Sequence, residues 1–585
     1  MKKLTLLMLL YVPFSFISKQ LNAQTPIITS FTPSSGPPGT LVTIIGTNLL
    51  SPTGFTIGGA TALEISNTGT KLVGMVMPAS VTGTVSLTTV NGTAISSGNF
   101  TVTATPYPAV QQGSKVVGTG AGVWSNPFQG GSVSLSADGN TGVVGATGDG
   151  DNGYVGAVWV YSRSVGVWSQ EGSKLVGTGA VGAAGQGSAV SLSADGNTAI
   201  VGAIANVGAW IYTRSAGIWT QQGSKLPGTI AVGDWAPQGC SISADGNTAI
   251  VGGQDDSIGV GAAWVYVRSA GLWTQQGNKL VGTGAAGNAR QGCSVSLSSD
   301  GNTAIIGGRY DNSYTGAVWI YIRSAGVWTQ QGSKLVGTGA VGAAQQGTAV
   351  SLSADGNTAI VGGSYDDGST GAAWIFTRNA GVWKQQGNKL IGTGAVGNAW
   401  QGCSVSLSAD GNTAIVGGDY DNGYMGAVWV FTRSGGVWTQ RGSKLVGTGA
   451  LGPWVYQGRS VSLSSDGSTA LIGGSGDNSY TGAAWVFVSS ATVGIENANT
   501  SSKQLSVYPN PNSGVFAVSP SDFECRTICE GDYSIVNSIG EIVQSFKLNA
   551  INNYSIEIEN LSNGLYYIVG FNENQMSGQK VLVAK

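Results

Sequence analysis

The sequence predicts an all-β protein in which a seven-bladed β-propeller lies between two smaller β-sandwich domains. The first observation is a stretch of about 55 residues that recurs along the middle of the chain, each copy carrying an S-x-D-G step and a Trp in an apolar run. The second is that residues 25–104 and 507–585 lack this period but contain short apolar runs separated by turns. The Asp and the Trp each occur seven times: Asp138, Asp195, Asp245, Asp300, Asp355, Asp410 and Asp466, and Trp159, Trp210, Trp264, Trp319, Trp374, Trp429 and Trp485.

Each copy contains four apolar runs, which in the fifth copy are Ala349–Ser353, Thr358–Gly362, Gly371–Thr377 and Gly381–Ile391. The joints between them, such as Ala354–Asn357, are tight turns, and short joints force antiparallel pairing. The third run is apolar at every position, so both of its faces must be covered. Stacked blades meet this demand, and we expect a propeller. A β-solenoid is the alternative, but its coils are shorter and lack repeated hairpin turns.

The phase of the repeat predicts how the ring closes. The last copy ends after its third run, Ala483–Val488, and the missing fourth strand stands before the first copy at Gln111–Gly118. We expect this strand to pair into the last blade, which leaves no open edge between the first and last blades.

The propeller region, residues 108–488, resembles the bacterial FG-GAP-type repeats related to the integrin α-chain propeller. The matching segments are V-G-A/G, the Asp- and Asn-rich loop, G-A-x-W-V-Y and W-x-Q-Q. The resemblance implies adhesion. The name-giving Phe-Gly is Gln-Gly here, at Gln186, Gln346 and Gln401, and the D-x-D-x-D-G ladder that binds calcium is missing. Calcium dependence is therefore not expected.

The N-terminal part predicts export and an immunoglobulin-like domain. Residues 1–23 have the form of a signal peptide, with Lys2 and Lys3 before a short apolar run. Within residues 25–104, the stretch Ile28–Leu49 with Ile57–Gly59 resembles the IPT/TIG family, which implies a spacer or binding module. Pro106–Pro108 is predicted to be a linker to the propeller.

After a linker at residues 489–506, the end of the chain resembles the C-terminal sorting domain of the type IX secretion system. That resemblance implies the secretion machinery as a partner, passage across an outer membrane, and release or surface attachment. We expect no membrane segment once the signal peptide is removed. Cys525 and Cys529 could form a local disulfide in an oxidising compartment. The residues that carry the resemblance include Tyr508, Pro509, Asn510, Pro511, Gly514, Gly540, Gly564, Tyr566 and Lys585.

Composition excludes several functions. Charged residues are 10% of the chain and the net charge is −2, so binding to nucleic acid or to an anionic membrane is not expected. The chain has no histidine, which excludes Ser-His-Asp catalysis and His-ligated zinc. We predict no cofactor and no metal site, because the Asp-rich loops at Asp149–Asn152, Asp255–Asp256 and Asp366–Asp367 offer fewer oxygens than calcium requires. We interpret them as turns.

The strand order predicts which face of the propeller could bind a ligand. Chain direction reverses at each turn, so the joints between strands two and three share one face with the connections between blades. These loops differ between copies and carry large aromatic residues, which are favoured binding anchors. A glycan is the first expected ligand, because flat rings can stack on sugars, and a protein is the second. The alternative is that the rings pack over the loop bases. The candidate residues are Trp124, Trp235, Arg290, Trp400, Trp454 and Tyr456 in the connections, and Tyr154, Tyr310, Tyr314, Tyr365, Tyr420, Tyr424 and Tyr480 in the joints.

These observations favour a non-catalytic, secreted or cell-surface binding or adhesion protein. One alternative is a secreted carbohydrate-active enzyme that uses propeller carboxylates, since paired acids can cleave glycosidic bonds without histidine. The other is a structural spacer.

Overall fold

The computed structural model describes residues 24–490 except 123–125, 151–153, 181, 205–207 and 227–236, and in the C-terminal part residues 505–508, 516–520, 531–537, 542–548, 556–558, 561, 564–572 and 575–583. Strands and turns dominate the described residues, which confirms the predicted all-β class. The predicted signal peptide lies outside them. The chain divides into two compact units, Met1–Thr492 and Val493–Lys585. None of the described helices is long and apolar enough to cross a membrane.

Two facing sheets form the immunoglobulin-like domain. Alternate residues of β3 and β8 are buried, and Val42, Ile44, Leu72 and Phe100 belong to one core. One sheet has the order β1 (Ile27–Thr32), β3 (Leu41–Thr47), β7 (Lys71–Met75) and β6 (Leu63–Asn67). The other has the order β2 (Ser35–Gly36), β9 (Gly92–Val102), β8 (Gly83–Thr89), β4 (Gly54–Ile57) and β5 (Ala60–Thr61).

The next part of this unit is a β-propeller of seven four-stranded antiparallel sheets. The innermost strands are β11 (Ser132–Leu135), β15 (Val190–Leu192), β19 (Pro237–Ile242), β23 (Gln291–Leu297), β27 (Ala349–Leu352), β31 (Ser404–Leu407) and β35 (Gln457–Leu463). The second strands are β12 (Thr141–Ala146), β16 (Thr198–Gly202), β20 (Thr248–Gly253), β24 (Thr303–Gly308), β28 (Thr358–Gly363), β32 (Thr413–Gly418) and β36 (Thr469–Gly474).

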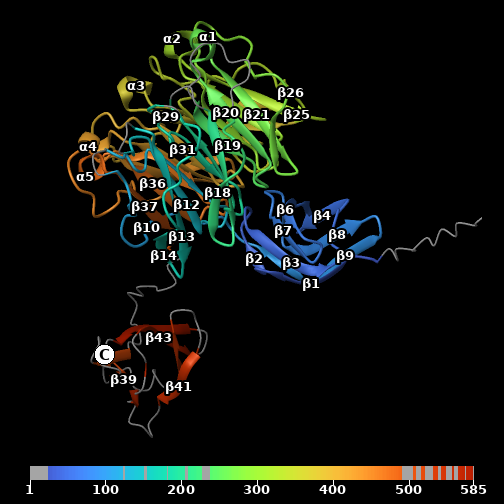
Figure 1. The fold of residues 1–585 in the computed structure, drawn as a ribbon, viewed down its shortest axis with the longest axis vertical. Helices are drawn as coiled ribbons and strands as arrows, with labels where there is room; N and C mark the ends of the chain where they lie inside the picture. The colour runs from blue at the N-terminus through green and yellow to red at the C-terminus, as the bar shows by residue number, and fades with distance from the viewer. Residues whose placement is uncertain are drawn as a thin grey trace, which may run out of the picture. The chain divides into compact units, whose positions relative to one another are not determined.

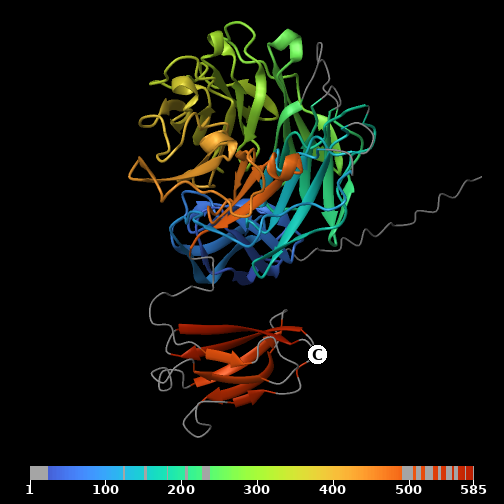
Figure 2. The same cartoon turned by 90° about the vertical axis from the view of Figure 1, so that its left-hand side faces the viewer.

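The third strands are β13 (Ala157–Ser164), β17 (Ala209–Ser215), β21 (Ala262–Ser269), β25 (Ala317–Ser324), β29 (Ala372–Asn379), β33 (Ala427–Ser434) and β37 (Ala483–Val488). The outermost strands are β14 (Val167–Gln170), β18 (Ile218–Gln221), β22 (Leu272–Gln275), β26 (Val327–Gln330), β30 (Val382–Gln385) and β34 (Val437–Gln440), and the last blade takes β10 (Val110–Gln111) instead. The chain visits the blades in order, from cyan through green and yellow to orange (Figure 2).

The ring closes through a strand from before the first blade, as the sequence predicted. β10 pairs antiparallel with β37 through Val110 and Val488 and through Gln111 and Phe487. An isolated bridge joins Val116 to Ala484 further along. The first and last blades therefore lie side by side, with β36 and β37 close to β12 and β13 (Figure 1).

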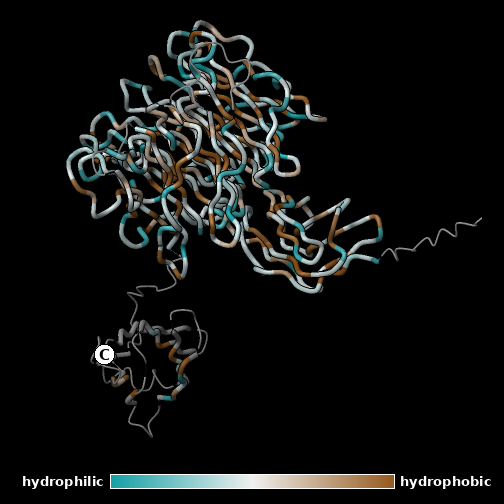
Figure 3. Tube along the Cα trace, in the orientation of Figure 1, coloured by the Kyte–Doolittle hydropathy of each residue, from teal (hydrophilic) through white to brown (hydrophobic). Residues whose placement is uncertain are grey.

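The recurring tryptophan is the core of each blade. All seven indoles are fully buried. In the fifth blade the Trp374 indole nitrogen donates to the Thr338 carbonyl oxygen at 2.8 Å. Gly337 lies against the same ring, where a Cβ atom would stand 2.2 Å from Trp374 Cδ1, so this position requires glycine. Apolar residues accordingly follow the blade strands, while polar residues are frequent in the turns (Figure 3).

The S-x-D-G turns of all seven blades are joined in one closed circle of backbone hydrogen bonds. Within each turn the Asp accepts bonds from the preceding Ser hydroxyl and from a following backbone N–H, as Asp355 does from Ser353 and Asn357. This confirms that the Asp is a turn residue. The circle runs from N–H to carbonyl as Ala137 to Ala194, Ala194 to Ala244, Ala244 to Ser299, Ser299 to Ala354, Ala354 to Ala409, Ala409 to Ser465 and Ser465 to Ala137, at 2.8–3.0 Å.

The immunoglobulin-like domain packs on this circle. Ile65 and Met75 belong to one buried apolar cluster with the turn alanines, among them Ala137 and Ala354. The segment predicted as a linker also contacts the propeller, because Thr105 Oγ1 donates to Asp410 Oδ2 at 2.5 Å and the Pro106 carbonyl accepts from Thr413 at 3.3 Å. The face with the S-x-D-G turns is therefore covered.

The C-terminal unit consists of two sheets around one core. One has the order β38 (Leu505–Tyr508), β39 (Phe516–Pro520) and β42 (Ile556–Ile558). The other has the order β41 (Ile542–Leu548), β40 (Gly531–Asn537), β43 (Gly564–Asn572) and β44 (Gln575–Val583). Tyr566 is in the core with Phe516, Ile535 and Ile568. Pro509, Asn510, Pro511, Gly514, Gly540, Lys585, Cys525 and Cys529 lie outside the described residues.

Removal of the closing strand tests this architecture. Deleting residues 107–118 exposes the edge of β37, and we expect the melting temperature of the propeller to fall by about 5 °C or more, measured by scanning calorimetry. The control is removal of residues 493–585, a separate unit, which should leave the propeller transition in place. An unchanged transition in the 107–118 deletion would show that ring closure does not depend on β10.

Candidate functional site

On the face opposite the S-x-D-G turns, the described residues include five short helical turns between the second and third strands. These turns lie together along one margin of the propeller (Figure 1). Their central residues are left-handed, for example Asn312 at φ 48° and Ser313 at φ 54°. The turns are α1 (Asp256–Gly259), α2 (Asp311–Tyr314), α3 (Asp366–Ser369), α4 (Asp421–Tyr424) and α5 (Asp477–Tyr480).

The first Asp of each turn is buried and neutralised by a lysine. Asp311 has no exposed surface, its Oδ2 accepts from Lys334 Nζ at 2.5 Å, and its Oδ1 accepts from the Ala286 N–H at 2.7 Å. The loop carboxylates thus hold the turn to the connection that enters the same blade, a role that the interpretation as turns alone missed. The five pairs of these turns, at 2.5–2.7 Å, are Lys115–Asp477, Lys279–Asp256, Lys334–Asp311, Lys389–Asp366 and Lys444–Asp421. In the described part of the first blade, Lys174 pairs with Asp149 in the same way at 2.5 Å.

Large side chains occupy backbone positions that favour glycine. Trp400 and Tyr456, each just before a Gln-Gly step, have φ of 57° and 58°. Gly185 takes the same position in another blade at φ 59°. A non-glycine residue in this region costs roughly 1–3 kcal/mol, and such strain clusters at functional sites. The left-handed position recurs before other Gln-Gly steps, at Phe128, Arg290 and Gln345, so the backbone is common to the blades while the side chain on it varies.

The Gln of the Gln-Gly step has a structural role. The Gln401 side chain is buried, where its carbonyl oxygen accepts from the Gly392 N–H at 2.5 Å and its amide donates to the Gly392 carbonyl at 3.0 Å. The same pair of bonds joins Gln346 to Gly337. A carboxamide can make both bonds at once, which explains Gln at this position.

A continuous row of aromatic rings crosses the fifth, sixth and seventh blades. The Trp400 ring stacks on Tyr420 with centroids 3.7 Å apart, and its other neighbour is Tyr365 at 4.8 Å. Tyr420 contacts Tyr424 at 4.8 Å and Tyr456 at 5.8 Å. We call these five residues the aromatic row. Tyr365 and Tyr424 are 38% exposed, so the row reaches the surface.

Two smaller aromatic groups flank the aromatic row. In the fourth blade, Tyr310 and Tyr314 lie 4.7 Å apart, and the guanidinium groups of Arg290 and Arg309 lie 5.3 and 5.2 Å from the Tyr310 ring. Arg290, Tyr310 and Tyr314 line a hollow of about 610 Å³. On the other side of the aromatic row, Tyr480 contacts Phe128 at 5.4 Å, a residue that sequence reasoning missed.

The remaining predicted residues are not part of these groups. Tyr154 and Trp454 are exposed on the same face, and no aromatic contact joins them to another ring of the described chain. Trp124 and Trp235 lie outside the described residues. Of the thirteen candidates, the structure therefore brings five together in the aromatic row and three, Arg290, Tyr310 and Tyr314, in the fourth-blade group, while Tyr480 contacts Phe128.

Charged groups on this face are mostly paired. Arg290 forms an ion pair with Asp255, and the buried Asp419 accepts from Arg459 at 3.0 Å. Burial, and then the carboxylate of Asp419, raise the pKa of the Tyr420 phenol above its ordinary value. The phenol is therefore neutral at physiological pH and remains a hydrogen-bond donor. Such a surface can stack on a ligand and donate hydrogen bonds.

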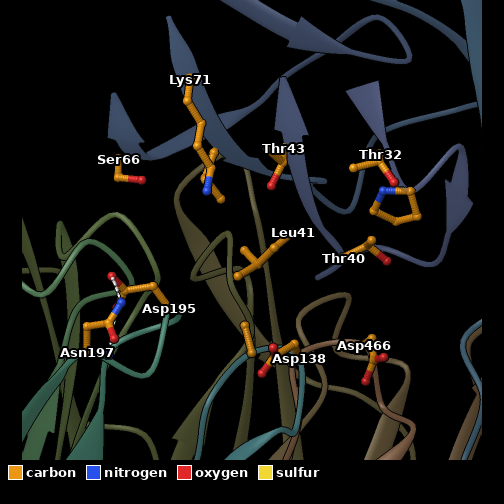
Figure 4. A pocket seen from close by; sticks show the side chains of 13 residues that line it. Thr32, Thr40, Leu41, Thr43, Ser66, Lys71, Asp138, Asp195, Asn197 and Asp466 are labelled. Atoms are coloured by element: carbon orange, nitrogen blue, oxygen red, sulfur yellow. Dashed lines mark hydrogen bonds between the residues drawn. The ribbon is translucent and has the colours of Figure 1, made fainter. Parts of the chain in front are cut away.

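A second cavity, of about 590 Å³, lies between the immunoglobulin-like domain and the propeller. Lys71 from one side faces Asp138, Asp195 and Asp466 on the other (Figure 4). All three carboxylates are already bonded within their own turns, to Ser136, Ser193 and Ser464. This cavity is therefore a polar gap at a domain contact, and the aromatic face is the better candidate for a site.

Comparison with protein families identifies the two end domains. The IPT/TIG domain model matches residues 26–104, and the secretion system C-terminal sorting domain model matches residues 506–584. The sorting domain indicates export to the cell surface or to the medium. No curated protein matches the chain.

Solved structures resemble the fold only distantly. A putative 6-phosphogluconolactonase from Bacteroides uniformis is 13% identical with a TM-score of 0.41, over 54% of this chain and 85% of that chain. An auxiliary nutrient binding protein from Bacteroides thetaiotaomicron is 11% identical with a TM-score of 0.32, over 79% and 97%. Kuenenia stuttgartiensis hydrazine synthase is 15% identical with a TM-score of 0.38, over 61% and 95%. Similarities this low carry no argument about function.

Removal of one buried ion-pair partner tests the role of the loop carboxylates. Lys334→Met leaves the Asp311 carboxylate buried without its cation, and we expect the free energy of unfolding to fall by about 3 kcal/mol in urea denaturation. The double variant Asp311→Asn, Lys334→Met should recover part of the loss, because Asn can still accept the Ala286 N–H. The control is Lys384→Met, an exposed lysine of an outermost strand that forms no ion pair with the described residues, which should have no effect. Equal stability of Lys334→Met and the wild type would contradict this role.

Proposed function

We propose that the protein is a non-catalytic, secreted or surface-attached binding protein that holds a glycan on the aromatic row. The observation that carries this proposal is the continuous, partly exposed row of five rings on the face that the immunoglobulin-like domain leaves free. Sugar rings present apolar C–H faces that stack on aromatic rings, and neutral phenols donate to hydroxyl groups. The immunoglobulin-like domain supports the propeller from the other side.

The proposal also includes an N-terminal signal peptide and a relationship of the blades to a known repeat family. Residues 1–23 act as a signal peptide, and the blades are related to FG-GAP-type repeats, for which adhesion is the implied role. The pairing of Asp255 and Asp419 with arginine supports binding over glycoside hydrolysis, because two acids must be free to act on a substrate.

Replacement of one strained residue separates binding from packing. Trp400→Gly removes an aromatic-row residue and at the same time suits the left-handed backbone, so we expect glycan binding to weaken by at least about tenfold while the melting temperature stays level or rises. Binding is measured on a glycan array and then by calorimetric titration of the strongest hit.

Two controls complete the comparison. Tyr154→Gly removes an exposed tyrosine of the same face and backbone region without ring neighbours, and should bind as the wild type does. Trp429→Ala empties a blade core and should lower the melting temperature strongly. If Trp400→Gly melts well below the wild type, the aromatic row is packing. If Trp400→Gly binds the glycan with the affinity of the wild type, the aromatic row is not the binding site. Turnover of any glycan on the array by the wild type would favour an enzyme.

Export depends on the C-terminal unit. Removing residues 505–585 from the chain, expressed in a host with a type IX system, should leave the protein in the periplasm, as measured by cell fractionation and immunoblotting. The matched control fuses residues 505–585 to a periplasmic carrier, which should then reach the surface or the medium. Normal export of the truncated protein would refute the role of this unit.

A further inference from the structure

We infer that the ligand of this face is an uncharged polysaccharide, bound through a series of similar subsites at consecutive blades from the fourth to the seventh. This inference rests on the proposed glycan-binding function and specifies the length and the charge of the ligand.

The subsites arise because the left-handed turn places one polar side chain at the same point in each blade. The second residue of the turn is Asn312 in the fourth blade and Asn422 in the sixth, and both side chains are exposed. Its backbone N–H is fixed by the neighbouring inter-blade connection, as Asn312 is by the Ala286 carbonyl at 3.0 Å. The four residues at this position are Asn312, Asp367, Asn422 and Asn478.

Each of these polar side chains belongs to a turn that also presents aromatic rings. The turn with Asn312 carries Tyr310 and Tyr314, and the turn with Asn422 carries Tyr420 and Tyr424. A sugar residue needs both kinds of group, a ring for its C–H face and a donor or acceptor for its hydroxyls. One such pair at each blade therefore suits one sugar or a short segment of sugars.

We call the loops of the fourth to seventh blades on this face the arc. The subsites adjoin one another over part of the arc. Trp400 of the connection after the fifth blade stacks directly on Tyr420 of the sixth, and Tyr456 of the next connection contacts Tyr420 and Tyr424. The hollow beside Arg290, Tyr310 and Tyr314 lies toward the fourth-blade end. A ligand that uses the whole arc must be a chain, because a single sugar covers only one ring pair.

Charge on the arc argues for a neutral chain. The cations Arg290 and Arg459 are each held by a carboxylate of the protein, Asp255 and Asp419. The lysines beneath the turns are paired with buried aspartates. Among the described residues of these four blades, Arg309 has no ion pair and donates to Gln254 at 3.1 Å, and its positive charge is offset by the negative charge of the exposed Asp367. No net field thus favours an anionic polymer.

Several subsites in series raise affinity with chain length, because each further contact is made at a high effective concentration. The test is calorimetric titration of the full mature chain with oligomers of two, four and six sugars, cut from whichever of cellulose, xylan, mannan and β-1,3-glucan binds best. Pectate is the acidic comparison. We expect the hexamer to bind at least about tenfold more tightly than the dimer. We also expect less than about a twofold change between about 0.05 and 0.5 M salt, and weaker binding of pectate.

A variant in the fourth blade tests whether the oligosaccharide extends to that end of the row of subsites. The double change Asn312→Gly, Tyr314→Gly removes one subsite at backbone positions that suit glycine, and should reduce hexamer affinity severalfold while the tetramer binds as before. Tyr154→Gly is the matched control.

The outcomes separate this inference from the proposed function. Equal affinity for all three lengths would overturn the series of subsites and leave glycan binding intact. Preferred, salt-sensitive binding of pectate would overturn the neutral ligand. Binding of no glycan in any arm would overturn the proposed function together with the inference.

Discussion

The closed circle of backbone hydrogen bonds at the S-x-D-G turns is the constraint on which the rest of the structure depends. Each turn donates to the next blade and accepts from the previous one, so all seven innermost strands are held in one ring. The bonds use main-chain groups that would otherwise be buried without partners, and leaving such groups unpaired is costly. This explains why Ser, Asp and Gly recur there with little change.

The two faces of the propeller have different roles, and the circle lies on the face that packs against the immunoglobulin-like domain. Small residues at the turns, mostly alanine, create an apolar floor that the immunoglobulin-like domain covers through Ile65 and Met75. The opposite face is fixed at its base by buried Lys–Asp pairs and by the bidentate Gln-to-Gly bonds. Because these bonds fix the loop bases, the loops of this face can carry different residues at each blade. Trp400, Tyr424 and Tyr456 have left-handed backbone conformations in these loops.

Much of the fold was predictable because it follows from local periodicity. The apolar third run identified Trp374 and its counterparts as core, and the phase of the repeat located the closing strand before the first blade. The candidate face followed from strand reversal alone. The contacts between Trp400 and Tyr420 were not predictable, because they join residues of different loops whose distance depends on the ring as a whole.

Other features could have been found from the sequence but were missed. The Lys of the S/N-K-L step and the first Asp of the loop recur together, which is the signal of the buried pair Lys334–Asp311. The second blade lacks this Asp, which obscured the pattern. No sequence pattern predicted that the immunoglobulin-like domain packs on the circle, because a single alanine in each turn does not indicate that another domain covers it.

The most direct measurement is a crystal structure of the mature chain with the tightest-binding neutral hexasaccharide. Binding at the aromatic row predicts sugar rings stacked over Trp400, Tyr424 and Tyr456, with hydroxyl groups near Asn422 and the propeller backbone unchanged. A ligand in the cavity beside Lys71, or on the outer strands with the aromatic row bare, would contradict the assignment of the binding face.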